Sequence, residues 1–390
     1  MGSTHNPMHG MKFLVVGGGP VGLAAALALK ARGITDDITV LEAASREQRV
    51  FSDRNIALSA ASWRFLSRLN VMVPPTERAP IVDVEVSQRG AFGLLRLTAD
   101  DVGANELGAA TPYPSVKTAL DNAIHAADIH ILYGAKAQRV EHVARHAVVH
   151  LESGEQLRAD CVVLADGAGS DLVNDFKRLE RDSGQMAVIT RVSPAKPRPG
   201  VAFERFTAGG ALALVPRADK EWTVIWARPR TEAERLLQLD PATLSDEINA
   251  AFSPNMGALT ITAKATSYPL VWRFVEPRAS GAIVALGNAA QGLHPAAAQG
   301  LNLGLRDAQD LADLFSHAGD CNTETIAPTL AKFARKRGPD RVARIGFTGM
   351  LAYGFDRGGW LFDVPRGLGL TAVQMLPPLR RELVRHLALG

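Results

Sequence analysis

The stretch "MKFLVVGGGPVGLAAALALKARGITDDITVLEAAS", Met11 to Ser45, decides the fold. An apolar strand over residues 13–16 leads into a glycine-rich turn, and an alanine- and leucine-rich helix follows to about Arg32. Gly33 stands where helices commonly end, and a second apolar strand covers Ile38 to Leu41. Strand, helix and strand in about 30 residues form a βαβ unit with two parallel strands. The pattern predicts an α/β domain built on a doubly wound parallel sheet.

The glycines at the turn fit a phosphate-binding site, because they match G-x-G-x-x-G between a strand and a helix. Such glycines let the backbone approach a pyrophosphate, which then lies at the positive end of the helix. Glu42 ends the second strand about 20 residues later, where an acid accepts hydrogen bonds from both ribose hydroxyls and disfavours a 2′-phosphate. The turn therefore predicts FAD or NAD, not NADP, as the bound dinucleotide. The residues expected to bind it are Gly17, Gly19, Pro20, Val21, Gly22 and Glu42.

Two later segments favour FAD. The apolar run "CVVLA" ends in Asp166-Gly167, and "AIVAL" ends in Gly287-Asn288. No second G-x-G-x-x-G introduces a separate nicotinamide domain. Three distant segments thus contribute to one dinucleotide site, and the larger molecule, FAD, better explains so extended a surface.

Composition excludes several classes of protein. The 390 residues carry a formal net charge of +3, which is too small to suggest nucleic acid as a partner. Cys161 and Cys321 make no disulfide framework, and the histidines lack metal-ligand spacing, so we expect no metal and a reducing cytoplasm. No apolar run approaches the roughly 20 residues that cross a bilayer. Residues 1–10 are predicted to be a disordered tail.

Over almost its whole length the sequence resembles the FAD-dependent aromatic hydroxylases of the p-hydroxybenzoate hydroxylase-like group. Within that group it is most similar to the ubiquinone-biosynthesis 2-polyprenyl-6-methoxyphenol hydroxylases. Besides the N-terminal fingerprint, the resemblance is carried by "DRNIALS" (Asp53 to Ser59), "SQRGAFG" (Ser87 to Gly93), "ADGAGS" (Ala165 to Ser170), "ERFTAGGALALVP" (Glu204 to Pro216), "YPL" (Tyr268 to Leu270) and "GNAAQGLHPAAAQGLNLGLRD" (Gly287 to Asp307).

The chain departs from the group at three places. Val173 stands where the group's D-G-x-x-S-x-x-R has arginine, and Ala298 replaces a loop glycine. Asn288 takes the place of the aspartate that most of the group has after Gly287, as the ubiquinone branch itself can show. The first two departures affect segments that hold the cofactor.

The resemblance implies a chemistry. It predicts a flavoprotein monooxygenase that hydroxylates the aromatic ring of a hydrophobic polyprenyl phenol in ubiquinone biosynthesis, with NAD(P)H and O₂, through a flavin C4a-hydroperoxide. The loop from His294 to Gly300 would follow the flavin ring, and the next helix would point its N-terminus at the flavin pyrimidine. The residues implied at the reaction are His294, Pro295, Gln299 and Gly300, with His294 ordering the loop rather than acting as a base. Further cofactor contacts are implied for Arg54, Asp166, Gly287, Asn288, Ala298, Gly300, Leu301 and Asn302.

The predicted organisation is interleaved. An FAD-binding domain takes residues 11–80, 98–180 and 278–340, an antiparallel-sheet substrate domain takes 81–97 and 183–277, and 341–390 form a helical C-terminal region. Strand patterns predict a hairpin around Arg89-Gly90 and successive strands in "MAVITRV", "VAFERFT", "ALALVPR" and "EWTVIWARP", with one helix from Thr231 to Phe252. Candidates for a greasy substrate wall, equally suited to the core, are Phe203, Phe206, Leu212, Leu214 and Trp226.

Three alternatives stay open. A buried arginine among Arg89, Arg191, Arg205 and Arg217 would instead favour a small soluble aromatic with a carboxylate. A flavin-dependent prenyl reductase would add hydrogen and not oxygen, and a non-catalytic FAD-binding subunit would do neither. A polyprenyl substrate implies a membrane surface or a ubiquinone-biosynthesis complex as partner, with the protein peripheral to the inner membrane.

Overall fold

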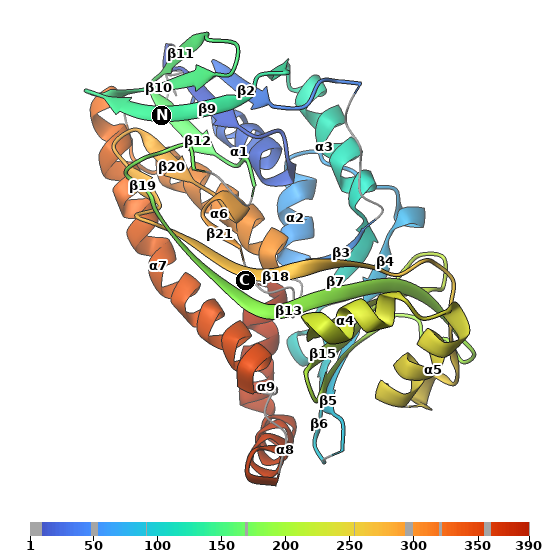
Figure 1. Ribbon diagram of the computed structural model, residues 1–390. Helices are drawn as coiled ribbons and strands as arrows, with labels where there is room; N and C mark the ends of the chain where they lie inside the picture. The colour runs from blue at the N-terminus through green and yellow to red at the C-terminus, as the bar shows by residue number, and fades with distance from the viewer. Residues whose placement is uncertain are drawn as a thin grey trace.

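The structure is a computed structural model that describes residues 10–47, 54–90, 92–167, 171–252, 254–292, 299–319, 322–354 and 360–389. Two large sheets dominate it, and the long strands β13 and β18 run from one part of the molecule into the other (Figure 1). Residues 1–9 of the predicted tail lie outside the described residues.

The first sheet confirms the predicted parallel sheet. Its order is β19-β20-β12-β1-β2-β8, and all neighbours run parallel except β19 and β20. Helix α1 packs beside α3 and α6, and its N-cap is Gly19 with Pro20 in the first turn. The bounds are β1 Phe13–Val16, α1 Pro20–Ala31, β2 Ile38–Glu42, α3 Tyr113–Ala126, β8 His130–Tyr133, β12 Cys161–Leu164, β19 Ala279–Ser280, β20 Ile283–Ala285 and α6 Gln299–Ser316.

Two small sheets complete this part of the molecule. The order β3-β7-β4 is antiparallel and connects to helix α2, while β11-β10-β9 contributes Val140 and Val149 to the core of the first sheet. The bounds are β3 Asn55–Ser59, α2 Ala60–Arg68, a 3₁₀ turn Pro75–Glu77, β4 Ala79–Ile81, β7 Gly108–Pro112, β9 Ala137–Val143, β10 His146–Leu151 and β11 Gln156–Ala159.

The second sheet contains every strand predicted for the substrate domain. Its order is β21-β18-β13-β16-β15-β14-β5-β6, with β17 also paired to β13. The sheet is antiparallel except that β14 runs parallel to β5, because the β5–β6 hairpin joins its edge from an earlier part of the chain. The bounds are β5 Asp83–Gln88, β6 Leu94–Thr98, a 3₁₀ turn Ala99–Val102, β13 Lys177–Pro194, β14 Val201–Thr207, β15 Gly210–Pro216, β16 Trp222–Pro229, β17 Leu259–Ile261, β18 Thr266–Glu276 and β21 Gln291–Gly292.

The single helix predicted from Thr231 to Phe252 is wrong in one respect. Two helices occupy this stretch, α4 (Arg230–Leu237) and α5 (Pro241–Ala251), and a 3₁₀ turn Pro254–Met256 follows. Asp240 caps α5 by accepting the amide N–H groups of Ala242 and Thr243. Proline has no amide hydrogen to continue a preceding helix but suits the first turn of a new one. Asp240-Pro241 therefore ends one helix and begins another.

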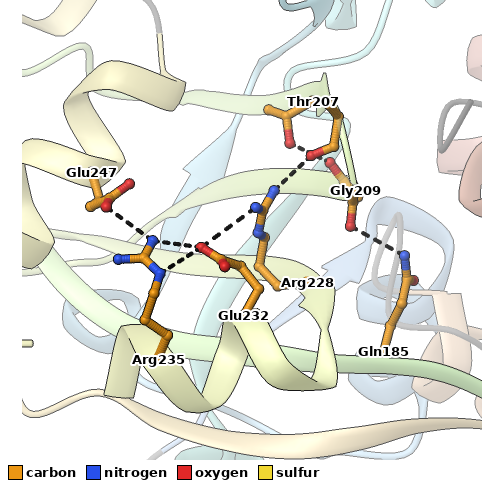
Figure 2. A network of polar contacts seen from close by, with 9 residues as sticks. Gln185, Thr207, Gly209, Arg228, Glu232, Arg235 and Glu247 are labelled. Atoms are coloured by element: carbon orange, nitrogen blue, oxygen red, sulfur yellow. Dashed lines mark hydrogen bonds and ion pairs between the residues drawn. The ribbon is translucent and has the colours of Figure 1, made fainter. Parts of the chain in front are cut away.

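None of the five candidates for the greasy wall lines the cavity described below, and the alternative that they belong to the core holds, since all five are buried. Phe203, Leu212, Leu214 and Trp226 lie in a core cluster with residues of α4 and α5, on one face of the second sheet. A polar network fastens the two helices there: Arg235 donates to Glu232 and to Glu247, both at 2.9 Å (Figure 2). Phe206 is buried on the other face, and the cavity described below opens on that face without contacting it.

The C-terminal region is helical, as predicted, in α7 (Thr323–Gly354), α8 (Trp360–Met375), α9 (Pro377–Val384) and a π-helical turn, Arg385–Leu389. Helix α7 runs through residue 341, where the sequence suggested a boundary. Val384 and Ala388 pack on Leu95 and Leu97 of strand β6. Within the described ranges, no helix is both long and apolar enough to span a bilayer.

Candidate active site

A cavity of about 1160 Å³ lies between the two large sheets. One side is formed where strands β1, β2 and β12 end, and the other by strands β13, β15, β16 and β18. Sites for a single small molecule occupy roughly 300–1,000 Å³. This cavity therefore has room for a dinucleotide and for part of a second molecule.

The glycine turn is open toward this cavity. A β-carbon on Gly17, which has φ +110°, would lie 2.5 Å from the carbonyl oxygen of Ala165, and one on Gly22 would lie 2.0 Å from the carbonyl oxygen of Gly17. A β-carbon on Gly19 would meet no atom of the described residues within 4 Å. Gly17 and Gly22 thus permit close packing of strand and helix. Gly19 instead leaves backbone without a side chain at the cavity, beside Pro20 and Val21. These features fit a bound pyrophosphate.

Glu42 lies over the same turn. Its Oε1 accepts a hydrogen bond from the amide N–H of Ala44 at 3.0 Å. Its Oε2 would lie 2.5 Å from a β-carbon on Gly18, and the residue lines the cavity. One carboxylate oxygen is therefore oriented by the chain, and the group is placed to receive ribose hydroxyls beside the pyrophosphate turn.

Three other predicted cofactor residues line the cavity from separate segments. Arg54 stands before β3 with its guanidinium 5.6 Å from the ring centre of Tyr113, Asp166 follows β12, and Asn288 lies in the 3₁₀ turn Gly287–Ala289. Gly287 has φ +55°, and a β-carbon there would lie 3.1 Å from Val21, so this glycine allows the turn to pack on α1. The structure brings together side chains more than two hundred residues apart.

The start of helix α6 also reaches the cavity. Gly300 and Leu301 line it, and the nearest atom to a β-carbon on Gly300 would be Oδ1 of Asn288 at 3.9 Å. Gln299 begins the helix, but its side chain lies outside the described part of the structure. His294, Pro295 and Ala298 lie outside the described residues altogether.

The side chain of Asn302, for which the sequence implied a contact with the cofactor, is directed into hydrogen bonds with β3 and α2. Its Oδ1 accepts hydrogen bonds from the amide N–H of Ser59 and from the hydroxyl of Ser62, both at 2.8 Å. Its Nδ2 donates to the carbonyl oxygen of Ala57 at 3.0 Å. The side chain thus fastens α6 to β3 and α2, and it is not among the residues that line the cavity.

Sequence reasoning assigned no role to Asp307, a fully buried carboxylate behind the site. It accepts hydrogen bonds from the amide N–H of Gly287 at 3.2 Å, from Arg278 at 2.7 Å and from Arg337 at 2.8 Å. The aspartate thereby holds the Gly287 turn in place and joins it to helix α7. Val173, the departure from the family arginine, is 6% exposed and packs in the core of the first sheet.

The wall formed by the second sheet mixes apolar and polar side chains, and its threonines are Thr190, Thr223 and Thr266. The hydroxyl of Thr223 is buried without a hydrogen-bond partner in the described structure. Burial raises the pKa of Tyr268 on the same wall. Two cations stand toward one end: Arg191 lies 3.8 Å from Glu221, and Arg217 lies 3.4 Å from Asp219. The apolar members of the wall are Ile189, Val215, Ile225 and Leu270.

Comparisons with known proteins identify the family of the chain. A family model described as "FAD binding domain" matches residues 11–320. The chain is 26% identical to a protein named ubiquinone hydroxylase UbiL from Rhodospirillum rubrum, over 96% of this chain and 88% of the relative. It is 25% identical to ubiquinone hydroxylase UbiM from Neisseria meningitidis, over 96% and 84%.

A similar fold occurs in a solved structure of Pseudomonas aeruginosa PqsL in complex with 2-aminobenzoylacetate. The TM-score is 0.76 at 22% identity, with 93% of this chain and 99% of the other covered.

Proposed function

This chain belongs to the FAD-binding domain family, and from that premise we propose that it hydroxylates the aromatic ring of a hydrophobic phenol in ubiquinone biosynthesis. The names of its relatives support an FAD-dependent aromatic hydroxylase. The substrate we propose carries a polyprenyl tail, and NAD(P)H and O₂ are the co-substrates. A membrane surface or a biosynthetic complex would deliver this phenol to the protein.

One observation supports this proposal above the others: a single cavity joins the glycine turn to a sheet wall on which Ile189, Val215 and Ile225 offer apolar surface. Bound FAD supplies the redox chemistry, taking electrons from a nicotinamide and passing them to O₂. The residues of the chain hold and orient the two molecules. Glu42 and the glycine turn bind the cofactor, and Ile189, Val215 and Ile225 exclude water from the opposite side.

The mass of the product tests the reaction. We expect incubation of the FAD-loaded protein with NAD(P)H, O₂ and a 2-prenylphenol, whose tail holds a double bond, to give a product heavier by one oxygen atom, labelled when ¹⁸O₂ is used. A product heavier only by hydrogen would establish the prenyl reductase. An unchanged phenol under conditions in which a tight complex forms would favour the non-catalytic subunit.

Arg191 and Arg217 favour a second candidate substrate, a small aromatic with a carboxylate. Both side chains reach the cavity, and only 9% of the Arg217 side chain is exposed. A guanidinium binds a carboxylate through two parallel hydrogen bonds. Substrate-stimulated NAD(P)H oxidation distinguishes the candidates when it is measured for phenols of increasing tail length and for p-hydroxybenzoate. Each buried methylene adds up to about 0.8 kcal/mol of binding, so affinity should rise with tail length. A preference for p-hydroxybenzoate without any effect of tail length would contradict the polyprenyl proposal.

A further inference from the structure

Helix α8 is apolar on two opposite sides, and the described part of the chain covers one of them. Leu370 and Val373 pack on a core cluster that includes strand β6. Val364, Leu368 and Met375 follow one another at spacings of four and seven residues, so they form one stripe on the other side of the helix. These three side chains are 42%, 57% and 74% exposed. The outer stripe is therefore an apolar surface that a partner can reach.

This stripe continues onto the neighbouring segments. Leu376 and Leu379 follow it where α8 passes into α9, and each is about half exposed. Phe92, between β5 and β6, is half exposed too, and its ring would lie 3.0 Å from a β-carbon on Gly367, so it stands beside α8. Single exposed apolar side chains are ordinary, but a group of them on adjoining segments marks an interaction surface. We call this group the docking face: Phe92, Val364, Leu368, Met375, Leu376 and Leu379.

The positive charge of the protein is concentrated in the same region of the chain. Residues 341–390 contain seven arginines, no lysine and three acids, a net charge of +4, whereas the whole chain carries +3. The first 340 residues are therefore close to neutral. An apolar surface within the cationic part of a protein favours a partner that is both apolar and anionic.

Two of these arginines are exposed beside the docking face. Arg381 and Arg385 lie one turn apart at the end of α9. Glu382 lies 3.8 Å from Arg385, but both members of this pair are more than half exposed, so water screens their attraction. Arg380 has another role, because it donates to Asp101 at 2.8 Å and thereby fastens α9 to the rest of the protein. The two exposed guanidinium groups are thus held by a helix that is itself anchored.

Helix α8 covers the same face of the second sheet that bounds the cavity. Val86 of β5 packs in the cluster under α8 and pairs with Glu204 of β14. Glu204 pairs with Ala213, and Ala213 pairs with Ile225, which lines the cavity. Paired residues in neighbouring strands project from the same face of a sheet. A partner on the docking face would therefore lie on the cavity side of this sheet.

These features together fit the surface of an anionic phospholipid bilayer. Apolar side chains of an interfacial helix enter the boundary between headgroups and acyl chains, and basic side chains beside them bind the anionic headgroups. A second copy of this chain fits less well, because a twofold contact through the docking face would bring the same arginines of both copies together.

We propose that the protein docks on an anionic phospholipid bilayer through the docking face, with α8 lying along the membrane surface. This assignment rests on the proposed function for its purpose, since a polyprenyl phenol is dissolved in such a bilayer. The binding itself needs only the exposed apolar side chains and the two arginines.

The test is flotation of the FAD-loaded protein with vesicles in a density gradient, without turnover. Vesicles of phosphatidylcholine alone are compared with vesicles that contain about 30% phosphatidylglycerol. We expect roughly twentyfold tighter binding to the anionic vesicles, because each arginine at such a surface strengthens binding about fivefold. Raising NaCl from about 0.05 to about 0.5 M should remove most of this difference.

Two double variants separate the apolar and the charged parts of the surface. Leu368→Gln with Met375→Gln should weaken binding to anionic vesicles at least about tenfold, because two apolar side chains no longer enter the bilayer. Arg381→Gln with Arg385→Gln should bind both kinds of vesicle about equally. All four side chains are exposed, so FAD content and far-UV circular dichroism should match those of the wild type.

Matched controls make the same kinds of substitution elsewhere. Val143→Gln with Leu179→Gln replaces two apolar side chains that are 50% and 61% exposed on β9 and β13. Arg139→Gln with Arg158→Gln removes two exposed charges from the small sheet β9–β11, at the opposite end of the molecule from α8 (Figure 1). Both controls should bind vesicles as the wild type does.

Three results would overturn the assignment. They are a wild type that does not float with anionic vesicles, a folded Leu368→Gln/Met375→Gln variant that floats as the wild type does, and a dimer in lipid-free sedimentation that this variant dissociates. The last result would assign the docking face to a second copy of the chain. Oxygen transfer to 2-prenylphenol without vesicles is measured separately, so its absence would count against the proposed function and not against membrane docking.

Discussion

At the scale of single residues, we expect dinucleotide binding to depend most on the side chain of Glu42. Its Oε1 is held by the amide of Ala44, and its Oε2 lies over the glycine turn. We expect Glu42→Ala to weaken FAD binding by about 1–3 kcal/mol, because a charged hydrogen-bond acceptor is lost. Quenching of FAD fluorescence during titration of the apoprotein measures this. Glu47→Ala is the control, and an unchanged affinity in Glu42→Ala would contradict the ribose assignment.

We expect the small size of Gly300 to be needed for function and not for folding. The structure assigns it no left-handed backbone, and among the described residues a β-carbon there would meet only Asn288, at 3.9 Å. Gly300→Val should therefore fold but push its branched side chain into the cavity and slow the reduction of bound FAD by NAD(P)H. Stopped-flow absorbance measures that rate, with Gly300→Ala as a milder control. Reduction at the parent rate in folded, FAD-loaded Gly300→Val would show that this backbone does not approach the flavin.

The raised pKa of Glu204, in strand β14, predicts how stability depends on pH. Its pKa is raised by burial from 4.5 to about 7, so the folded state holds the proton more tightly than the unfolded state. The contribution of this group to stability should be fully present below pH 4.5, fall as pH rises from 4.5 through 7, and remain lower above that. Glu204→Gln removes this dependence and should exceed the wild type by about 2–3 kcal/mol at pH 8, but not at pH 5. Urea unfolding at both pH values checks it; a difference that does not depend on pH would contradict the buried-acid interpretation.

At the scale of elements, the buried ion pairs of Asp307 hold three segments together. Arg278 precedes β20, Gly287 follows it, and Arg337 belongs to α7. Asp307→Asn would leave the buried Arg278 without its carboxylate and Arg337 with Asp310 alone, which should cost about 3–5 kcal/mol in the free energy of unfolding. Urea unfolding measures this, and Asp313→Asn is a matched control on the same helix because its partner Arg32 is half exposed. Equal losses in the two variants would show that burial of the pairs does not matter.

The sequence predicted those elements that local pattern determines. The βαβ unit from Phe13 to Glu42 came out as expected, because strand, glycine turn and helix each leave a signal within a few residues. The division between α4 and α5 also has a local signal, Asp240-Pro241. The prediction missed this signal because the apolar periodicity on both sides of it favours one continuous helix.

Relations between distant segments could not be predicted. Alternation in "ALALVP" shows that Leu212 and Leu214 share one face, but not that α4 and α5 cover this face while Val215 faces the cavity. The partners of Asp307 lie about 30 residues away on either side, a spacing that leaves no periodic signal. Asn302 looked like a cofactor ligand within its motif, and only the packing of α6 on β3 shows that its amide is engaged there.

At the scale of the whole molecule, the cavity lets one ligand contribute to the stability of both large sheets. FAD that fills it would contact residues from both, so binding should stabilise them together. A ligand present at 100 times its dissociation constant adds about 2.7 kcal/mol to stability. We expect added FAD to raise the melting temperature in one cooperative transition, measured by calorimetry with and without the cofactor. Two transitions, of which FAD shifts only one, would show that the sheets unfold separately.

The parallel sheet has a consequence for how the chain is made. Strand β1 pairs with β12 at Cys161–Leu164, and β12 in turn needs β20 at Ile283–Ala285. A ribosome adds about 5–20 residues per second, so the interval between these two strands lasts on the order of ten seconds. During this interval the edge of β12 is apolar and its backbone N–H and C=O groups are unpaired. Exposed strand edges of this kind can pair with other chains. Chaperone occupancy during synthesis should therefore peak after β12 emerges and end when β20 does.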